Sequence, residues 1–357
     1  MAADPLVDVN LFVYEGATMV AAAIESVLAQ TWPALSLTLI DDGSTDGTAE
    51  ILASYAARDP RIRVVRNRGN GGAIANFQRA FWYGDADFVL PKSGDDLIAP
   101  EFVERVMSVL LSEPDCAMCH AAGIIFHDDG RPGEAYPEAH RLDAGHADPL
   151  ARAQAVMARY TSAPSFWGVY RRAAAAKLAP IAYRAGWDHV LLAELALYGT
   201  VRHVPELLYW RRDGGKPVAR LARASCLQAT RGVALNDALA EQRWRTPLIT
   251  TAYAHIENFA AARLNFADRV ALIEAVPPIF RARWLPALRD EAAQLAAALP
   301  ARFAELGTMR GPARRIMAGV LADVLRAAMA LVPEAGLDLA ALELAAIAGE
   351  GELHVAA

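Results

Sequence analysis

The chain has 357 residues, of which 54% are hydrophobic and 21% charged, so it can bury a sizeable core in one large domain or two ordinary ones. Its 35 Lys and Arg residues against 41 Asp and Glu residues give a formal net charge of −6, which excludes a global basic footprint for nucleic acid. Three cysteines are too few for a disulfide scaffold and suit a reducing compartment.

The sequence shows no targeting or membrane-spanning segment. Its first residues lack the basic start and apolar block of a signal peptide. The most apolar late stretch, residues 316–333, is interrupted by Asp323 and Arg326, which argues against a membrane span. We therefore expect a cytoplasmic protein.

Residues 7–126 alternate between segments with the two-residue period of strands and segments with the helical period. Short polar loops separate these segments. The alternation predicts an α/β fold in which a mostly parallel, Rossmann-like sheet is covered by helices on both faces. The predicted strands are 7–14, 35–40, 62–65, 88–90 and 117–126, and the predicted helices are 19–28, 48–57, 71–81 and 100–110.

The pattern changes in the second half of the chain. Residues 131–160 are rich in Pro, Gly, His and acidic residues and become helical near 151–159. Strands are predicted at 166–170 and 201–210, and helices at 171–178 and 188–197. After residue 216 strand signals nearly vanish and Ala- and Leu-rich helical segments continue to Ala357. We therefore predict an α/β domain over 1–216 and an all-α domain over 217–357.

Polar residues gather where four of the predicted strands stop, in the loops 14–15, 41–44, 67–72 and 93–96. Ligands of doubly wound sheets bind beyond the carboxyl ends of the strands. These four loops are therefore the candidates for a binding site.

The loop after the strand at 88–90 carries two adjacent carboxylates, Asp95 and Asp96. Such a pair is favourable beside Mg²⁺ or Mn²⁺, which prefers oxygen ligands and is commonly shared with the phosphates of a substrate. Gly94 allows close approach of the backbone. The alternative is a solvated turn in which Asp96 caps the next helix.

The loop at 41–48 also contains adjacent acids, Asp41 and Asp42. Asp and Gly form turns, and Thr45 or Asp46 could cap the next helix, but capping does not need two consecutive acids before the turn. A carboxylate here could accept a hydrogen bond from the imide N–H of a uracil ring. The loop is not a phosphate cradle, because Asp would repel phosphate.

Several segments together resemble family-2 glycosyltransferases of the GT-A fold, in order and nearly continuously over residues 7–110. The resemblance weakens from 115 to 215 and is absent beyond 217. It implies a nucleotide-sugar donor, usually a UDP-sugar, with Mn²⁺ or Mg²⁺ as cofactor, and it divides the first domain into a nucleotide-binding half, 1–115, and an acceptor half, 116–216. The matching segments are Val9–Tyr14, Ala23–Thr31, Leu39–Thr48, Asp59–Ile62, Asn70–Gly72 and Gly94–Asp96.

The resemblance also implies roles for single residues. Tyr14 matches the residue that packs on the base, and Asp42 matches the acid that reads it. Ser93 stands where the family has the first Asp of its D-x-D motif, so Asp95, aided by Asp96, is expected to hold the metal. Glu15 stands where Asn is usual. The implied donor site comprises Phe12, Tyr14, Glu15, Asp41, Asp42, Gly71, Ser93, Gly94, Asp95, Arg211 and Lys216.

In the acceptor half, the segment Gly186–His189 resembles the part of the family that carries the general base, which makes Asp188 the candidate. Asp188 also suits the cap of the following helix. We favour the base, because a catalytic carboxylate must lie where a substrate hydroxyl can reach it. Arg211, Arg212 or Lys216 could neutralise a diphosphate, and each could equally be a surface charge.

Two further patterns are interpreted as structural. Cys116 and Cys119 with His120 have the C-x-x-C-H spacing of haem attachment, but they lie in a predicted core strand, and buried cysteines are the commoner case. The arginines 310, 314 and 315 precede an apolar helix and could touch an anionic membrane at its inner face, whereas a solvated helix face is the favoured alternative.

These observations predict an inverting, metal-dependent glycosyltransferase of polysaccharide biosynthesis, acting on a glycan or lipid-linked acceptor and not on nucleic acid. The alternative is a non-catalytic nucleotide-binding or scaffold subunit, which the Ser93 departure and the helical tail suggest. A nucleotidyltransferase is disfavoured, because residues 14–17 lack basic side chains. The apolar C-terminal helices could mediate self-association.

Overall fold

The computed structural model describes residues 3–128, 133–137, 141–159, 165–181, 186–213, 247–309 and 311–337. Contacts divide the chain into two compact units, Met1–Ile181 with Leu191–Pro217, and Ala182–Val190 with Val218–Ala357. The predicted donor-site residue Lys216 lies outside the described residues, as does Arg310 of the basic cluster at 310–315.

The first unit is built on one mixed sheet with the strand order β3-β2-β1-β4-β8-β6-β9-β5, in which β7 also pairs with β6. The pairs β1–β2, β2–β3, β1–β4 and β6–β9 are parallel. The strands are β1 Val7–Val13, β2 Leu35–Asp41, β3 Ile62–Arg66, β4 Phe88–Ser93, β5 Leu97–Ile98, β6 Cys116–Phe126, β7 Glu134–Ala135, β8 Gly168–Arg171 and β9 Thr200–Arg212.

The mostly parallel α/β sheet predicted from the sequence is confirmed, with antiparallel pairing where β8 and the two-residue strands β5 and β7 join it. Strand β8 lies between β4 and β6 and is antiparallel to both. The period of an apolar strand does not reveal its direction, so this reversal was not predicted. The helices of this unit are α1 Val20–Leu28, α2 Thr48–Ala56, α3 Ala73–Ala80, α4 Phe102–Ser112, α5 Pro149–Arg159 and α6 Arg172–Ala175, together with the end of α7 Trp187–Leu195.

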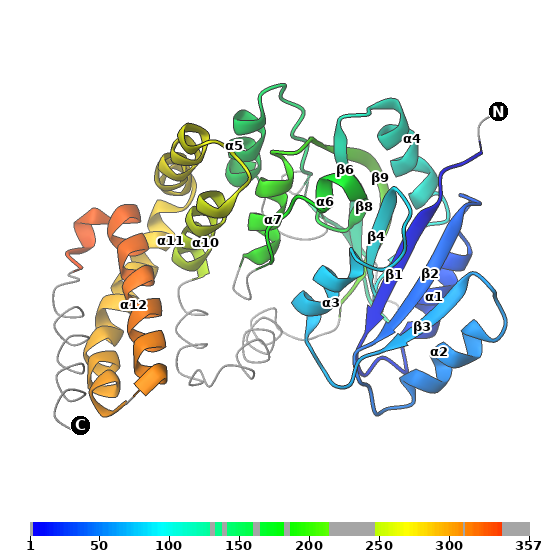
Figure 1. The fold of residues 1–357 in the computed structure, drawn as a ribbon, viewed down its shortest axis with the longest axis horizontal. Helices are drawn as coiled ribbons and strands as arrows, with labels where there is room; N and C mark the ends of the chain where they lie inside the picture. The colour runs from blue at the N-terminus through cyan, green and yellow to red at the C-terminus, as the bar shows by residue number, and fades with distance from the viewer. Residues whose placement is uncertain are drawn as a thin grey trace, which may run out of the picture. The chain divides into compact units, whose positions relative to one another are not determined.

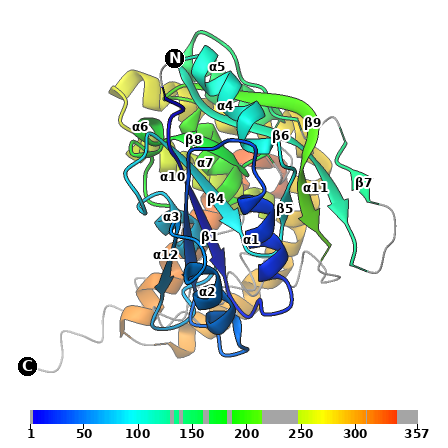
Figure 2. The same cartoon turned by 90° about the vertical axis from the view of Figure 1, so that its right-hand side faces the viewer.

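The strand order places a topological switch point between β1 and β4. From β1 to β2 to β3 the chain moves one way across the sheet, and from β3 to β4 it moves back. Because such crossovers are right-handed, α1 and α2 cover one face and α3 the other, as Figure 1 shows. Figure 2 shows α1 beside β5, with which it is in contact. Ligands of open α/β sheets bind at such a switch point.

Strand β1 is buried on both faces, although it contains two polar residues. Asp8 is paired with Arg172, at 2.6 Å, and accepts a bond from the Ala86 amide. The amide group of Asn10 donates to the carbonyls of Ala80 and Tyr83. The Asp8 carboxylate and the NH2 group of Asn10 are tolerated in this central strand because they meet partners inside the protein.

An aromatic cluster packs behind the carboxyl end of β1. Phe77 of α3 meets Phe12 edge-on, with ring centroids 6.5 Å apart, and Trp167 lies 6.0 Å from Phe12. Trp167 stacks on Tyr209 of β9 at 6.1 Å and 8°. The cluster therefore joins α3, the segment before β8 and β9 under the candidate site.

The second unit consists of helices in its described part, together with the start of α7. The helices are α10 Pro247–Ala261, α11 Phe266–Thr308 and α12 Gly311–Leu331, and they pack on one another (Figure 1). Helix α11 is interrupted at Trp284, two residues before Pro286. Proline removes a backbone donor and clashes with the preceding turn, which accounts for the kink.

Candidate functional site

Four parallel strands end level with one another at the carboxyl edge of the sheet. Phe12 of β1 pairs in register with Ser93 of β4, and Val13 pairs with Asp41 of β2. Asp41 in turn pairs with Arg66 of β3. The loops that follow these strands therefore start side by side, and they contain most of the residues predicted to bind the donor.

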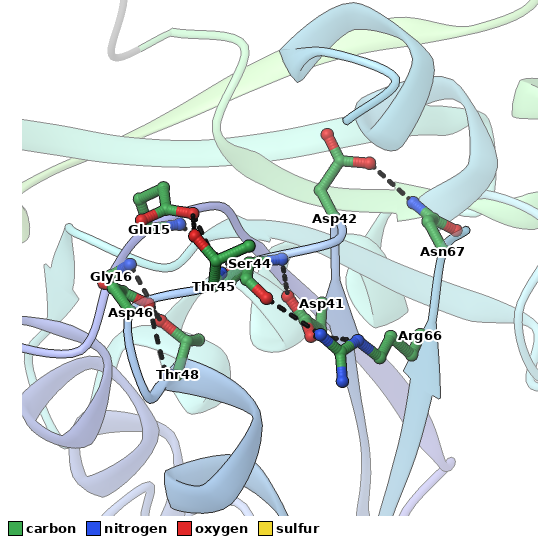
Figure 3. A network of polar contacts seen from close by, with 10 residues as sticks. All are labelled: Glu15, Gly16, Asp41, Asp42, Ser44, Thr45, Asp46, Thr48, Arg66 and Asn67. Carbon is green, nitrogen blue, oxygen red and sulfur yellow. Dashed lines mark hydrogen bonds and ion pairs between the residues drawn. The ribbon is translucent and has the colours of Figure 1, made fainter. Parts of the chain in front are cut away.

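Hydrogen bonds from backbone amides of the loop after β1 to side-chain oxygens of the loop after β2 hold the two loops together (Figure 3). The amide of Glu15 donates to the Ser44 hydroxyl and the amide of Gly16 to the Thr48 hydroxyl, each at 3.0 Å. The next amide, of Ala17, donates to Asp46. Three consecutive backbone donors are thus satisfied by one neighbouring loop, which fixes the loop after β1.

Glu15 has a strained backbone, and its side chain is hydrogen-bonded to the loop after β2. Its φ of 49° makes it the one non-glycine residue with positive φ in the described part of the chain, a conformation that costs about 1–2 kcal/mol. Its Oε1 accepts bonds from the amide and the hydroxyl of Thr45, at 2.9 and 3.0 Å. The predicted donor-site residue Glu15 therefore also braces the loop after β2.

Asp41 is completely buried at the end of β2. Its Oδ1 accepts a bond from the Ser44 amide at 2.9 Å, and its Oδ2 forms an ion pair with Arg66 Nε at 3.1 Å. Arg66 also donates to the Ser44 carbonyl. Asp41 therefore shapes the turn that carries Asp42, which is how it can contribute to the predicted site.

Asp42 is 2% exposed, and both of its oxygens are engaged by the protein. Oδ1 accepts from Asn67 Nδ2 at 2.7 Å (Figure 3) and from the Gly71 amide at 3.0 Å. Oδ2 accepts from the amides of Gly71 and Gly72, each at 3.0 Å. Three donors share the acceptor positions of this carboxylate, which number about four, so Asp42 organises the loop before α3 and retains about one position for a base.

Tyr14 and Phe12 differ sharply in exposure. Tyr14, at the end of β1, is 48% exposed, which leaves its ring available to a planar ligand. Phe12 is 8% exposed and belongs to the aromatic cluster with Phe77 and Trp167. Phe12 can therefore affect a donor only through the packing beneath it.

The end of β4 brings Ser93, Gly94 and Asp95 next to β1. The Gly94 amide donates to the Phe12 carbonyl at 2.9 Å, and a Cβ on Gly94 would lie 2.7 Å from Val13 Cβ. Only glycine fits this contact without displacing backbone. Asp95 is half-buried and accepts a bond from the Ser93 hydroxyl. The serine that departs from the family pattern is thus bonded to the predicted metal ligand.

Asp96 is turned into the protein. It is 4% exposed, and its oxygens accept bonds from the Tyr209 hydroxyl and, at 3.0 Å, from the Arg212 amide. Burial raises the pKa of Asp96 to about 6, and Asp95 adds to the rise. Burial and Asp96 also raise the pKa of Tyr209 well above its ordinary value, so the phenol keeps its proton.

Lys92 is a buried cation that the sequence analysis did not single out as a site residue. It has no exposed surface, and its ammonium donates to the carbonyls of Ser93 and Asp96, at 2.8 and 2.5 Å. Burial lowers the pKa of Lys92 to about 8. Because the two carbonyls flank Asp95, Lys92 closes the loop that presents this carboxylate. A lysine at the end of an otherwise apolar strand was the available signal.

The donor set fits a divalent cation through Asp95. A single carboxylate with a neighbouring hydroxyl suits the protein's share of a Mg²⁺ or Mn²⁺ site whose other oxygens come from phosphates and water. Asp96 does not fit the predicted role of a second ligand, because Tyr209 and Arg212 occupy both of its oxygens. Within the described ranges no three His, Cys, Asp or Glu side chains gather as a metal site.

Two cations at the end of β9, Arg211 and Arg212, lie near the same loop. Arg212 Nε donates to the Asp95 carbonyl at 2.8 Å, and its guanidinium is paired with Asp128. Arg211 donates to the Tyr136 hydroxyl at 2.8 Å. Arg212 thus supports the loop that carries Asp95. The sequence offered Arg211, Arg212 and Lys216 as equal candidates and could not show which of them makes this contact.

The predicted base, Asp188, lies in the first turn of α7 and is half-buried. The segment 182–190 belongs to the second unit, whereas α7 continues into the first. The base role of Asp188 stays a prediction.

Residues 9–146 match the sequence profile of glycosyl transferase family 2. This part of the chain is therefore similar to family-2 glycosyltransferases, and residues 9–146 are called the family-2 domain after this similarity. The match begins in β1 and runs through β6, so it includes all four strand ends described above.

Relatives of the family-2 domain span part of the chain. An uncharacterized glycosyltransferase of Escherichia coli, YibD, is 31% identical over 115 residues, which is 32% of this chain and 33% of that protein. The chondroitin synthase of Pasteurella multocida is 27% identical over 132 residues, 35% of this chain and 13% of that protein. The matches span a third to a half of the first curated relatives.

Among solved structures, residues 1–349 of TarS from S. aureus align with 92% of this chain and 91% of that chain, at 14% identity and a TM-score of 0.49.

Two further features bear on the sequence expectations. Cys116 and Cys119 are buried free cysteines, as expected for core residues, and burial raises the pKa of Cys116 to about 11. In the part of the chain that the structure describes, every helix is too short or too polar to cross a membrane.

Proposed function

We propose that this protein is a glycosyltransferase that moves a sugar from a nucleotide-sugar, a UDP-sugar, to a hydroxyl group of a glycan or lipid-linked acceptor. The family-2 domain supports the reaction class. The observation that carries the proposal is the half-buried Asp95 carboxylate, held on a braced loop at the switch point between β1 and β4.

The loops at the carboxyl edge of the sheet would contact different parts of the donor. The exposed ring of Tyr14 offers a face for the base, and the braced loops after β1 and β2 keep it in place. Asp95 would hold Mg²⁺ or Mn²⁺ together with the donor diphosphate. When bound, the ion supplies positive charge that stabilises the leaving nucleoside diphosphate. Arg211 supplies a further cation at this end of the sheet.

Transfer with inversion needs one base. The acceptor oxygen attacks the anomeric carbon, the bond from that carbon to the diphosphate oxygen breaks, and the acceptor proton passes to Asp188. No covalent sugar–enzyme intermediate is required, as in inverting hydrolysis.

The first experiment measures the melting temperature with UDP, GDP and dTDP, with and without Mn²⁺. At a UDP concentration of about 100 times Kd, binding stabilises the folded state by about 2.7 kcal/mol, and we expect a shift of about 5 °C for UDP with Mn²⁺. Asp95→Asn should lose the Mn²⁺-dependent part of this shift. The matched control is Asp85→Asn, an exposed carboxylate before β4.

Equal shifts for wild type and Asp95→Asn would contradict the proposed metal ligand, and no shift with any nucleotide would contradict donor binding. The second measurement is release of nucleoside diphosphate from UDP-, GDP- and dTDP-linked hexoses. Asp188→Asn should slow release at least about 100-fold while nucleotide binding persists. Metal-dependent binding without turnover would instead favour the scaffold alternative.

A further inference from the structure

The first turn of α7, which carries Asp188, packs against helix α10 of the C-terminal part. Gly186, just before this helix, has a φ of +72°, and a Cβ there would lie 2.1 Å from the Thr251 hydroxyl of α10. Glycine meets both demands, the left-handed backbone and the close approach. The Val190 amide donates to the Gly186 carbonyl at 3.1 Å, so the helix starts from this contact.

A pair of histidines forms the second attachment. His189 Nδ1 of α7 lies 2.6 Å from His255 Nε2 of α10. His189 is 7% exposed and His255 is fully buried. The rings pack against Phe259, Phe280 and Trp284, with centroid distances between 4.9 and 6.1 Å in this group. Water is therefore kept away from the hydrogen bond, which makes its loss costly.

The two facing ring nitrogens share one proton in this hydrogen bond. His255 Nδ1 is buried and has no hydrogen-bond partner among the residues described. Either tautomer gives one N–H···N hydrogen bond between the two rings, with His255 Nε2 or His189 Nδ1 as the donor. Burial lowers the pKa of His255 well below its ordinary value, which keeps the ring neutral at pH 7.

We propose that His255 is a positioning residue for the base: by its bond to His189 it holds the first turn of α7, and with it Asp188, on the C-terminal helices. The inference rests on the proposed function, in which Asp188 takes the acceptor proton. It gives the C-terminal helices a part in the reaction, although they touch no reacting atom. Displacing a catalytic group by about 1 Å can cost about 100-fold in rate.

The test compares three variants of the full chain. His255→Phe keeps an aromatic ring of similar shape and removes the nitrogen that is hydrogen-bonded to His189. His255→Gln restores a side-chain amide, which can donate a hydrogen bond to His189 or accept one from it. His203→Phe is the matched control, because His203 is a half-buried histidine beside His120, with ring centroids 5.0 Å apart, in the first unit.

Three quantities are measured: the Kd for UDP with Mn²⁺, the turnover number for release of nucleoside diphosphate from the hexose donors above, and the hydrogen exchange of backbone amides in α7. His255→Phe should lower turnover about tenfold or more, leave the Kd unchanged and speed exchange in the first turn of α7. His255→Gln should restore most of the turnover, and His203→Phe should behave as wild type.

The proposal is overturned if His255→Phe leaves α7 exchange unchanged, if it weakens UDP binding as much as it lowers turnover, or if Gln restores nothing. An inactive Asp188→Asn with a fully active His255→Phe also overturns it, while the proposed function stands. If instead Asp188→Asn and wild type turn over equally, the proposed base fails and the positioning role fails with it; the exchange data then still show whether His255 holds α7.

Discussion

Lys92 and Asp96 place two ionisable groups inside the protein at the end of β4. A buried ammonium is costly unless its donors are satisfied, and two of the three donors of Lys92 meet backbone carbonyls. The same bonds connect Ser93 to Asp96 across the residue that is proposed to hold the metal. The proposed metal site therefore depends on Lys92, although this side chain need not contact the nucleotide-sugar.

Replacing Lys92 by Met tests this support, because Met has a similar length and no donor. The carbonyls of Ser93 and Asp96 would lose their partner, which costs about 1–3 kcal/mol for a buried group. We expect a lower unfolding free energy in urea and a smaller melting-temperature shift with UDP and Mn²⁺. The control is Lys177→Met, an exposed lysine near Tyr198. A full shift in Lys92→Met would show that the loop holds Asp95 without Lys92.

Strands β1 and β4 approach so closely at their carboxyl ends that the side chain at position 94 must be absent. Gly94→Ala would bring a methyl group within 2.7 Å of Val13 Cβ and 3.0 Å of the Phe12 carbonyl. We expect an unfolding free energy lower by about 1–3 kcal/mol, the usual cost of overpacking, measured by urea denaturation. Gly69→Ala is the control, since a Cβ there meets nothing within 4 Å. Equal stability of the two variants would contradict the close approach.

Helices α10 and α11 are joined by a buried carboxylate. Glu291 of α11 accepts bonds from the amides of Leu248 and Ile249 in the first turn of α10, at 3.0 and 2.9 Å. The first residue of that helix, Pro247, has no amide hydrogen to satisfy. Glu291 therefore caps a helix that belongs to a different segment of the chain.

The titration of Glu291 predicts a pH dependence of stability. Burial raises its pKa from 4.5 to about 7, so between these values the folded state binds more protons than the unfolded state. The contribution of this group to stability is therefore full below about 4.5 and is lost as pH rises towards about 7. Urea denaturation between pH 5 and 8 should show a weaker fall in Glu291→Gln than in wild type. Exposed Glu274→Gln should keep the wild-type slope; an unchanged slope in Glu291→Gln would contradict the assignment.

The division of the whole molecule into units does not follow the order of the chain. The segment 182–190 belongs with the C-terminal helices, whereas the residues before and after it belong with the first unit. The candidate base is thus carried by one unit and the candidate donor site by the other.

A chain that ends at Pro217 tests this division. It keeps Asp188 but lacks Thr251, His255 and Phe280, which support the first turn of α7. We expect the melting-temperature shift with UDP and Mn²⁺ to persist, because the strand ends that form the donor site are retained, and turnover to be lost. Wild-type turnover in the shortened chain would show that the C-terminal helices are dispensable for catalysis.

The helices and strands in the first half of the chain were predictable because each is defined by residues within its own segment. Strands β1 to β4 and helices α1 to α4 begin and end within about three residues of their predicted bounds, since apolar period and turn residues define them. The same patterns located the loops of the candidate site at the strand ends. The direction of β8 was not predictable, because it depends on which strand lies beside it.

The sequence by itself determined the α/β pattern, the helical character of the C-terminal part and the loops that carry the acidic residues. Only the tertiary structure decided what those residues do: Asp42 bonds to the loop before α3, Asp96 bonds to Tyr209 of β9, and Lys92 is buried. The physical reason is that a side chain's partners are chosen by packing between distant segments. Two adjacent aspartates of identical chemistry therefore end with one half-buried beside Ser93 and the other enclosed by β9.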